Sequence, residues 1–291
     1  MEECNEKDKK NSSHWYDGTI IFELDTISEA NKKHLLNFQK NSNNSLTIVT
    51  GRNYFLTDFA VKELNINLPV ICSNGASVID PQTLKYVAKR HFKKAEIKEL
   101  LEKFLNTTID ICVPNDFRTH FIQDEEWIES LIENKMNLNF SHFPDGKVLY
   151  NYESLEQLIE KGLDLDESFP VLVANVKNDK QLEYVRNIVK NNNVLALEFP
   201  RGDKCRVEIF KKGVTKSWGL NKLLEKYDLS KEDIHLFGDE HNDFPMFEDF
   251  PNCYAVGNAI EGIKELSKEV IDTVQNAGVG KKLNKIIEEF K

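Results

Sequence analysis

IHLFGDEHND, at residues 234–243, joins a short apolar run to a group of carboxylate and amide side chains. An apolar run of this length is typical of a buried strand. Polar residues just beyond such a strand lie at its carboxyl end, where open α/β sheets bind ligands. Asp239 and Asp243 offer the hard oxygen atoms that Mg²⁺ prefers, although Asp and Asn are also ordinary turn formers. The segment therefore indicates an α/β sheet with a candidate ligand site at its edge.

Strand-like and helix-like patterns alternate on both sides of this segment. Apolar runs of strand length are found at residues 19–24, 45–50, 69–73, 234–238 and 253–256. Helical periodicity is found at residues 29–40, 216–227 and 281–290. Strands that alternate with helices favour a parallel sheet that is covered by helices on both faces.

The middle of the chain has a different pattern. Helices are expected at residues 95–105, 154–161 and 180–190, strands at 109–113 and 171–176, and a turn at 144–146. Helices interleaved with strands that alternate polar and apolar residues predict an α+β unit inserted into the α/β one. We place the insertion at residues 84–211 and the α/β core at 14–83 and 212–291. Residues 1–13 are expected to form a flexible tail.

The composition excludes several classes of protein. The 291 residues suffice for two packed units, because single cores rarely grow beyond roughly 250 residues. A net charge of −10 disfavours a nonspecific nucleic-acid surface, which needs clustered positive charge. The polar residues 1–14 do not form a secretory signal, and no apolar run is long enough to span a membrane. The five scattered cysteines form no metal or disulfide pattern, so we expect free thiols in a reducing cytoplasm. Together with the charge and the short apolar runs, this leads us to expect a protein that binds neither nucleic acid nor membrane.

Two further segments carry groups that suit a phosphate. TIVTGR, at 47–52, places Thr50 and Gly51 at the end of an expected strand, where a hydroxyl and backbone N–H groups can bind an anion. A helix-capping Thr is the structural alternative. EIFKKGVTK, at 208–216, opens a helix and ends on Lys216, a compact positive charge for a phosphoryl anion. A lone lysine is ordinarily a solvated surface residue, so only the order of the motifs gives Lys216 weight.

The order of these motifs resembles the haloacid dehalogenase (HAD) superfamily, and in particular its Cof-type phosphatases. Thr-Gly-Arg, a long insertion, Gly-Val-Thr-Lys and Gly-Asp-x-x-Asn-Asp follow one another, with 23 residues from Lys216 to Asp239. SNGA at 73–76, VGNA at 256–259 and AGV at 277–279 extend the resemblance over nearly the whole chain. It implies a Rossmann-like core with an inserted α+β cap domain that covers the site. It also implies a phosphatase for a small phosphorylated metabolite such as a sugar phosphate.

The resemblance assigns roles to individual residues. Thr50 would bind the transferring phosphoryl group, and Lys216 would neutralise its charge. Gly51, Asn74 and Asn242 would help to hold the substrate. The expected Mg²⁺ site comprises Asp17, Asp239 and Asp243, with Asp243 supporting the surroundings of the metal. In the inserted unit Arg118, His120, Trp127 and His142 could face a substrate, but a core or solvated role is expected for each.

The first motif departs from the family pattern. That pattern is Asp-x-Asp-Gly-Thr, in which the first Asp attacks phosphorus and the second is the acid/base. HWYDGT, at residues 14–19, keeps the second Asp as Asp17 but has Trp15 at the nucleophile position. Indole can neither attack phosphorus nor bind Mg²⁺. A second register is open, because FELDT at 22–26 offers Glu23 as nucleophile and Asp25 as acid/base.

Spacing favours the Asp17 register. Trp15 precedes Thr50 by 35 residues, which is the spacing that the resemblance implies, whereas Glu23 precedes it by 27. Two classes of function stay open. One is a phosphatase that is weak or uses another acid. The other is a catalytically inactive relative that binds a phosphorylated ligand or a protein partner. The intact Thr50, Lys216 and Asp239 favour the enzyme.

Overall fold

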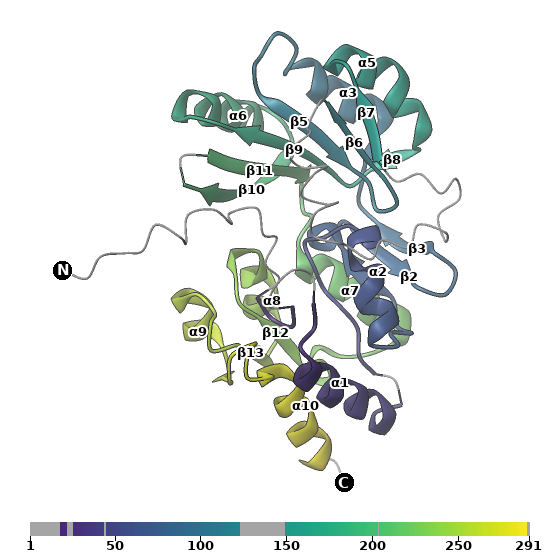
Figure 1. Ribbon diagram of the computed structural model, residues 1–291, viewed down its shortest axis with the longest axis vertical. Coiled ribbons are helices and arrows are strands. Elements are labelled where there is room, and N and C mark those ends of the chain that lie inside the picture. The colour runs from purple at the N-terminus through teal and green to yellow at the C-terminus, as the bar shows by residue number, and fades with distance from the viewer. Residues whose placement is uncertain (1–17, 22–25, 44, 123–148, 203, 290–291) are drawn as a thin grey trace, which may run out of the picture.

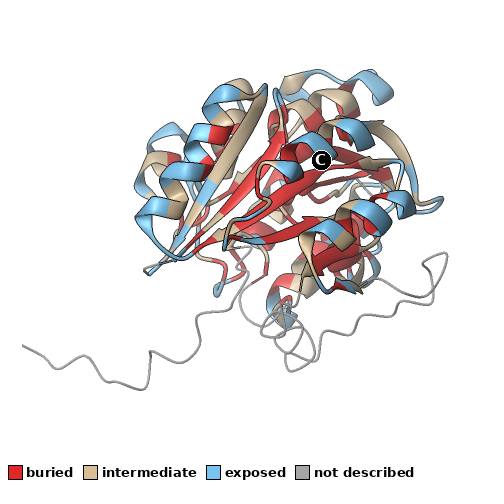
Figure 2. Cartoon of the chain, turned by 90° about the horizontal axis from the view of Figure 1, so that it is seen from above, coloured by how far each residue is buried: buried red, intermediate tan, exposed pale blue. Residues whose placement is uncertain are grey.

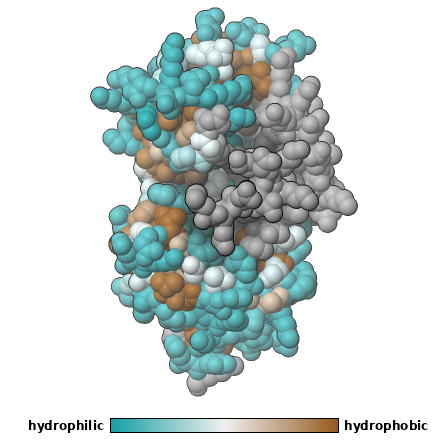
Figure 3. Space-filling model, turned by 60° about the vertical axis from the view of Figure 1, so that its left-hand side comes forward, coloured by the Kyte–Doolittle hydropathy of each residue, from teal (hydrophilic) through white to brown (hydrophobic). Residues whose placement is uncertain are grey.

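The computed structural model describes residues 18–21, 26–43, 45–122, 149–202 and 204–289. They form two units (Figure 1). The core unit contains the segments before residue 90 and after residue 211, and the inserted unit contains the middle of the chain. The face drawn in Figure 3 is mainly hydrophilic, as the charge of the chain leads one to expect. Within the described ranges no helix has the length and apolar character that crossing a membrane requires.

The core unit contains two groups of short strands. They are β1 (Val70–Cys72), β2 (Ser77–Asp80) and β3 (Lys85–Lys89) in one group, and β12 (Leu236–Gly238), β13 (Cys253–Ala255) and β14 (Glu269–Val270) in the other. The second group is entirely parallel. Val49 adds a parallel bridge to Ile71, and Thr50 N donates to Ile71 O at 2.9 Å. Thr50 therefore ends a segment that runs alongside β1.

Helices enclose these strands. They are α1 (Glu29–Asn41), α2 (Tyr54–Glu63), α7 (Lys216–Tyr227), α8 (Phe244–Asp249), α9 (Glu261–Leu266) and α10 (Gly278–Glu289). In the molecule as a whole, Figure 2 shows buried strands next to helices whose outer faces are exposed. The side chain of Thr215 accepts from Trp218 N at 3.1 Å, and this N-cap starts α7 at Lys216. The first residue of that helix is thereby fixed next to the strand ends.

The inserted unit is a second layer with its own sheet. Its elements are β4 (Phe92–Lys93), α3 (Lys94–Glu102), β5 (Asp110–Pro114), β6 (Thr119–Ile122), β7 (Leu149–Tyr152), α5 (Leu155–Lys161), β8 (Ser168–Phe169), β9 (Val171–Val176), α6 (Asp179–Asn191), β10 (Val194–Arg201) and β11 (Lys204–Lys211). Six strands pair in the order β10-β11-β9-β5-β6-β7. On β11, Val207 and Ile209 pack in the apolar core between the sheet and the helices of the inserted unit. Arg206 and Glu208 alternate with them and therefore point to the opposite face of the sheet. That face is turned toward the core unit.

Three sequence-based expectations need correction. β3 was assigned to the insertion at 84–211, yet it pairs with β2, so the inserted unit begins after this hairpin. The expected strand at 45–50 is limited to the bridge at Val49. Of the expected strand at 19–24, residues 19 and 20 lie in a turn and Ile21 makes an isolated antiparallel bridge to Ile27. Residues 22–25, the tail at 1–13 and the turn at 144–146 lie outside the described residues.

Candidate functional site

A left-handed turn at Ser73–Gly75 lies at the centre of the candidate site. Its three residues have φ angles of 51°, 54° and 96°. Such angles are uncommon for residues other than Gly and persist only where neighbouring contacts enforce them. Here Ser73 N donates to Arg52 O at 2.8 Å, and Asn74 N donates to Thr50 O at 3.1 Å. The turn is therefore fixed against the end of the strand that carries Thr50.

Asn74 links three parts of the chain. It is 2% exposed, and its Nδ2 donates to Glu208 Oε2 of the inserted unit at 3.0 Å. Its Oδ1 accepts from Asn242 Nδ2 at 2.9 Å. A side chain on Gly51 would contact Asn74 at 3.1 Å, so Gly51 allows the close approach. The structure brings together Asn74, Asn242 and Gly51, to which the resemblance assigned substrate binding.

Lys216 and Asp243 form a buried ion pair. Lys216 Nζ lies 2.6 Å from Asp243 Oδ1, and the two residues are 6% and 2% exposed. Asp243 Oδ2 accepts from the backbone N–H groups of Asp239 and Glu240, at 2.8 Å and 3.1 Å. Both oxygens of Asp243 are therefore engaged within the protein. This geometry suits the supporting role expected for Asp243 and leaves it poorly placed as a direct metal ligand.

Asp239 is the half-buried carboxylate of the site. Its Oδ1 accepts from Thr19 Oγ1 at 2.6 Å, and a side chain at Gly18 would meet its Oδ2 at 2.1 Å. Asn258 Nδ2 donates to Gly18 O at 2.8 Å and completes the contact. The Asp17 register predicts this position for Gly18 and Thr19. Asp17 itself lies outside the described residues, as do Trp15, Glu23 and Asp25, so the register stays a prediction.

The carboxylates of the site can be compared with the ligands that Mg²⁺ prefers. Within the described part of the chain, no three His, Cys, Asp or Glu side chains form a metal-binding group. Mg²⁺ usually needs only one or two carboxylates, with water and phosphate oxygens completing its shell. Asp239 fits one such position. A second carboxylate would come from Asp17, which directly precedes Gly18 in the sequence.

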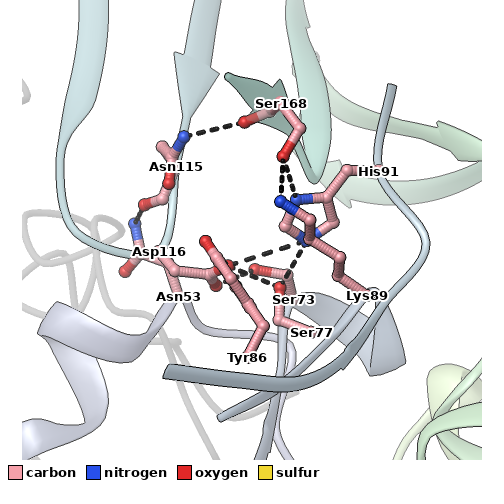
Figure 4. Close-up of polar contacts among 9 residues, drawn as sticks. All are labelled: Asn53, Ser73, Ser77, Tyr86, Lys89, His91, Asn115, Asp116 and Ser168. Carbon is pink, nitrogen blue, oxygen red and sulfur yellow. Dashed lines mark hydrogen bonds and ion pairs between the residues drawn. The ribbon is translucent and has the colours of Figure 1, made fainter. Parts of the chain in front are cut away.

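A loop of the inserted unit, residues 115–118, lies beside the left-handed turn and is called the docking loop below (Figure 4). Asp116, in the β5–β6 connection, accepts hydrogen bonds from Ser73 Oγ and Tyr86 Oη at 3.1 Å each, and from Ser77 Oγ. Burial raises the pKa of Asp116 to about 6, although these hydroxyl donors oppose the shift. Burial and nearby Lys89 lower the pKa of His91, which contacts Ser77 Oγ at 2.8 Å, to about 3. The loop thereby joins the two units through a buried polar network.

A cavity of about 40 Å³ lies where the two units meet. Gly51, Arg52 and Asn53 line it from the core unit, and Thr119 and Arg206 line it from the inserted unit. Gly51 follows Thr50 directly, so the cavity begins at the proposed phosphate-binding residues and extends toward the inserted sheet. The candidate site is therefore built from both units.

Comparison with known proteins identifies the family of the chain. The family model for haloacid dehalogenase-like hydrolases matches residues 16–283. The chain belongs to the haloacid dehalogenase-like hydrolase family. Among curated proteins, it is similar to the 5-amino-6-(5-phospho-D-ribitylamino)uracil phosphatase YitU of Bacillus subtilis. The two are 25% identical over 91% of this chain and 93% of that protein.

Solved structures of this family share the fold. A haloacid dehalogenase-like hydrolase from Bacteroides thetaiotaomicron matches with a TM-score of 0.75 and 17% identity, over 93% of this chain and 96% of that chain. The HAD subclass IIB sugar phosphatase BT4131 matches with a TM-score of 0.69 and 18% identity, again over 93% and 96%. The α/β fold expected from the alternation of strands and helices is confirmed.

Several residues of this family member were missed or left aside by the sequence reasoning. Asn53 and Asp116 gave no signal, because loops bring them together from distant parts of the chain. Glu208 belongs to the segment 208–216, and its spacing of two residues from Arg206 indicates that both side chains lie on one face of a strand. His120 has the expected core role, with its ring nitrogens bonded to Asp166 and Tyr152. Arg118 likewise pairs with Asp166 at 3.5 Å, while Trp127 and His142 lie outside the described residues.

Proposed function

We propose that this HAD-like hydrolase is a Mg²⁺-dependent phosphatase of a small phosphorylated metabolite, such as a sugar phosphate. The observation that carries the proposal is the hydrogen-bonded cluster of Asp239, Asp243 and Lys216. It lies next to the turn that contains Asn74, which is itself bonded to the strand end at Thr50. The names of YitU and BT4131, a phosphatase and a sugar phosphatase, support the same class of reaction.

The chemistry of phosphoryl transfer matches what these residues offer. The reaction asks mainly for positioning and for neutralisation of the charge on the phosphoryl oxygens. Lys216 supplies a buried positive charge, and Thr50 supplies a hydroxyl at the end of its strand segment. Asp239 would hold Mg²⁺ together with Asp17, and the bound ion would add charge stabilisation as a Lewis acid. Asp17 would also act as the acid/base.

Trp15 weakens the proposed reaction. A side chain without a nucleophilic atom at this position removes the route through an aspartyl-phosphate. Turnover is then expected to be lower by several orders of magnitude than at a nucleophilic site. The second candidate function follows from the same residue: an inactive relative that binds a phosphorylated ligand or a protein partner. The intact Lys216, Asp243 and Asp239 cluster favours the phosphatase.

Phosphate release from a panel of sugar phosphates, with and without Mg²⁺, tests the proposal. We expect turnover that requires Mg²⁺ and is lost in Asp239→Asn. Asp272→Asn, an exposed carboxylate far along the chain, is the matched control and should leave turnover unchanged. Turnover that is equal without Mg²⁺, or that survives Asp239→Asn, would contradict the proposed metal site.

Replacing Trp15 with Asp tests the motif-one register. The variant restores a carboxylate at the nucleophile position, so Mg²⁺-dependent turnover should rise by at least about 100-fold. Under the other register Trp15→Asp changes little and Glu23→Gln abolishes turnover. Wild-type turnover that survives both Asp17→Asn and Glu23→Gln would exclude both registers.

A further inference from the structure

Asn258 lies in the loop that follows β13, and its side chain links two other parts of the core unit. Its Nδ2 donates to Gly18 O at 2.8 Å, and its Oδ1 accepts from Val274 N at 3.0 Å. These two partners fix the orientation of the amide, because its nitrogen only donates and its oxygen only accepts. Asn258 therefore fastens Gly18, which is 240 residues away in the sequence, to the loop after β13.

The carboxylate of Asp239 lies between this loop and Gly18. A side chain at Gly18 would meet Asp239 Oδ2 at 2.1 Å and Asn258 Nδ2 at 3.2 Å. Thr19 Oγ1 donates to the other carboxylate oxygen at 2.6 Å, and Ile260 N donates to Asp239 O at 2.9 Å. Asn258 and Thr19 therefore hold the segment 18–19 against Asp239 from two directions.

This placement matters because the proposed metal site has few carboxylates. Within the described ranges no three His, Cys, Asp or Glu side chains form a metal-binding group, so the site depends on Asp239 and on Asp17, which directly precedes Gly18. Mg²⁺ demands near-octahedral geometry with oxygen ligands at about 2.0–2.1 Å. Two carboxylates from distant segments meet that demand only if the segments are held at a fixed separation. A side chain that fixes the separation acts on the metal through the ligands.

We propose that Asn258 is a positioning residue of this metal site. It holds the backbone of Gly18 beside Asp239, so that Asp17 and Asp239 can share one Mg²⁺. The inference rests on the proposed function, because it requires Mg²⁺ to bind at Asp239. It adds an uncharged residue from a third segment of the chain. Removing a residue that orients metal ligands usually weakens metal binding by about 10- to 100-fold.

The test compares Asn258→Ala with Asn252→Ala, its matched control. Asn252 precedes β13 as Asn258 follows it, and its Nδ2 also donates to a main-chain oxygen, Glu232 O, at 2.8 Å. Calorimetric titration of the metal-free full chain with Mg²⁺ alone measures binding whether or not turnover occurs. We expect the Kd for Mg²⁺ to rise by about 10- to 100-fold in Asn258→Ala and to stay within about twofold of the wild type in Asn252→Ala.

Thermal unfolding distinguishes positioning from a purely structural role. Each of the two variants loses two hydrogen bonds, so without Mg²⁺ their unfolding temperatures should fall by similar amounts. Added Mg²⁺ should raise the unfolding temperature of Asn258→Ala by less than that of Asn252→Ala, because a ligand stabilises the folded state according to its affinity. Asn258→Ser lacks the amide but keeps a polar side chain, and it should show the same weakened response if the alanine variant does not fold.

The outcomes separate the inference from the proposed function. If Mg²⁺ binds the wild type, Asn258→Ala and Asn252→Ala with the same Kd, the positioning role is wrong and the proposed metal site stands. If Mg²⁺ does not bind the wild type, or binds Asp239→Asn as tightly as the wild type, the proposed metal site fails and the inference fails with it.

Discussion

Lys216 and Asp243 show how one buried ion pair fixes the candidate site. Their charged atoms are 2.6 Å apart, and Asp243 also holds the backbone of Asp239 and Glu240. We predict that Lys216→Met destabilises the protein by about 3–5 kcal/mol, because it leaves a buried carboxylate without its counter-charge. Urea unfolding measures the loss. The double variant with Asp243→Asn should recover part of it, since it removes the unpaired charge.

Lys222→Met is the matched control on the same helix. Lys222 pairs with Glu225 at the surface, at 2.6 Å, and exposed pairs contribute little. Its loss should stay below about 1 kcal/mol. If Lys216→Met were as mild as this control, the pair would not be the buried anchor that the structure describes.

At the scale of elements, the Ser73–Gly75 turn meets the start of α7. Gly75 has a φ of 96°, and a side chain there would lie 1.9 Å from Thr215 O. We predict that Gly75→Ala destabilises the protein by more than about 3 kcal/mol, because the clash with backbone adds to the left-handed strain. Gly202→Ala is the control, with a φ of 62° and open space around it, and should cost only about 1 kcal/mol. Equal losses in chemical unfolding would show that the contact with α7 adds nothing.

The elements that the sequence predicted best are those with long apolar periodicity. α7 occupies residues 216–227 and β9 residues 171–176, as expected, because burial on one face or both dictates these patterns. The resemblance to the family also singled out Asn74 and Asn242, each of which follows a predicted strand. The sequence did not predict the docking loop around Asp116. Its carboxylate accepts hydrogen bonds from Ser73, Ser77 and Tyr86, which lie in distant parts of the chain. Periodicity does not report which loops meet.

At the scale of the whole molecule, the docking loop sets how the two units are joined. Phe117 lies between the rings of Tyr54 and Tyr86, with centroids 5.9 Å from each. Asp116 beside it is fully buried and sits against the same turn that presents Asn74. The contact that joins the units is therefore also a contact that shapes the site. The buried carboxylate of Asp116, whose pKa is raised, makes the junction responsive to pH.

Asp116 has a raised pKa of about 6, against 3.8 for an ordinary Asp, so the folded protein holds its proton more tightly than the unfolded chain. The contribution of protonated Asp116 to the free energy of unfolding is therefore fully present below pH 3.8, and it is lost as the pH rises through 6. We predict that the wild type gains about 2 kcal/mol over Asp116→Asn when the pH falls from 7 to 4.5. Urea unfolding at several pH values measures this difference. The control is Asp272→Asn, whose difference from the wild type should hardly change, because the pKa of Asp272, about 2, lies below this pH range. A difference between wild type and Asp116→Asn that does not vary with pH would mean that the carboxylate is solvated, and that the loop does not dock as described.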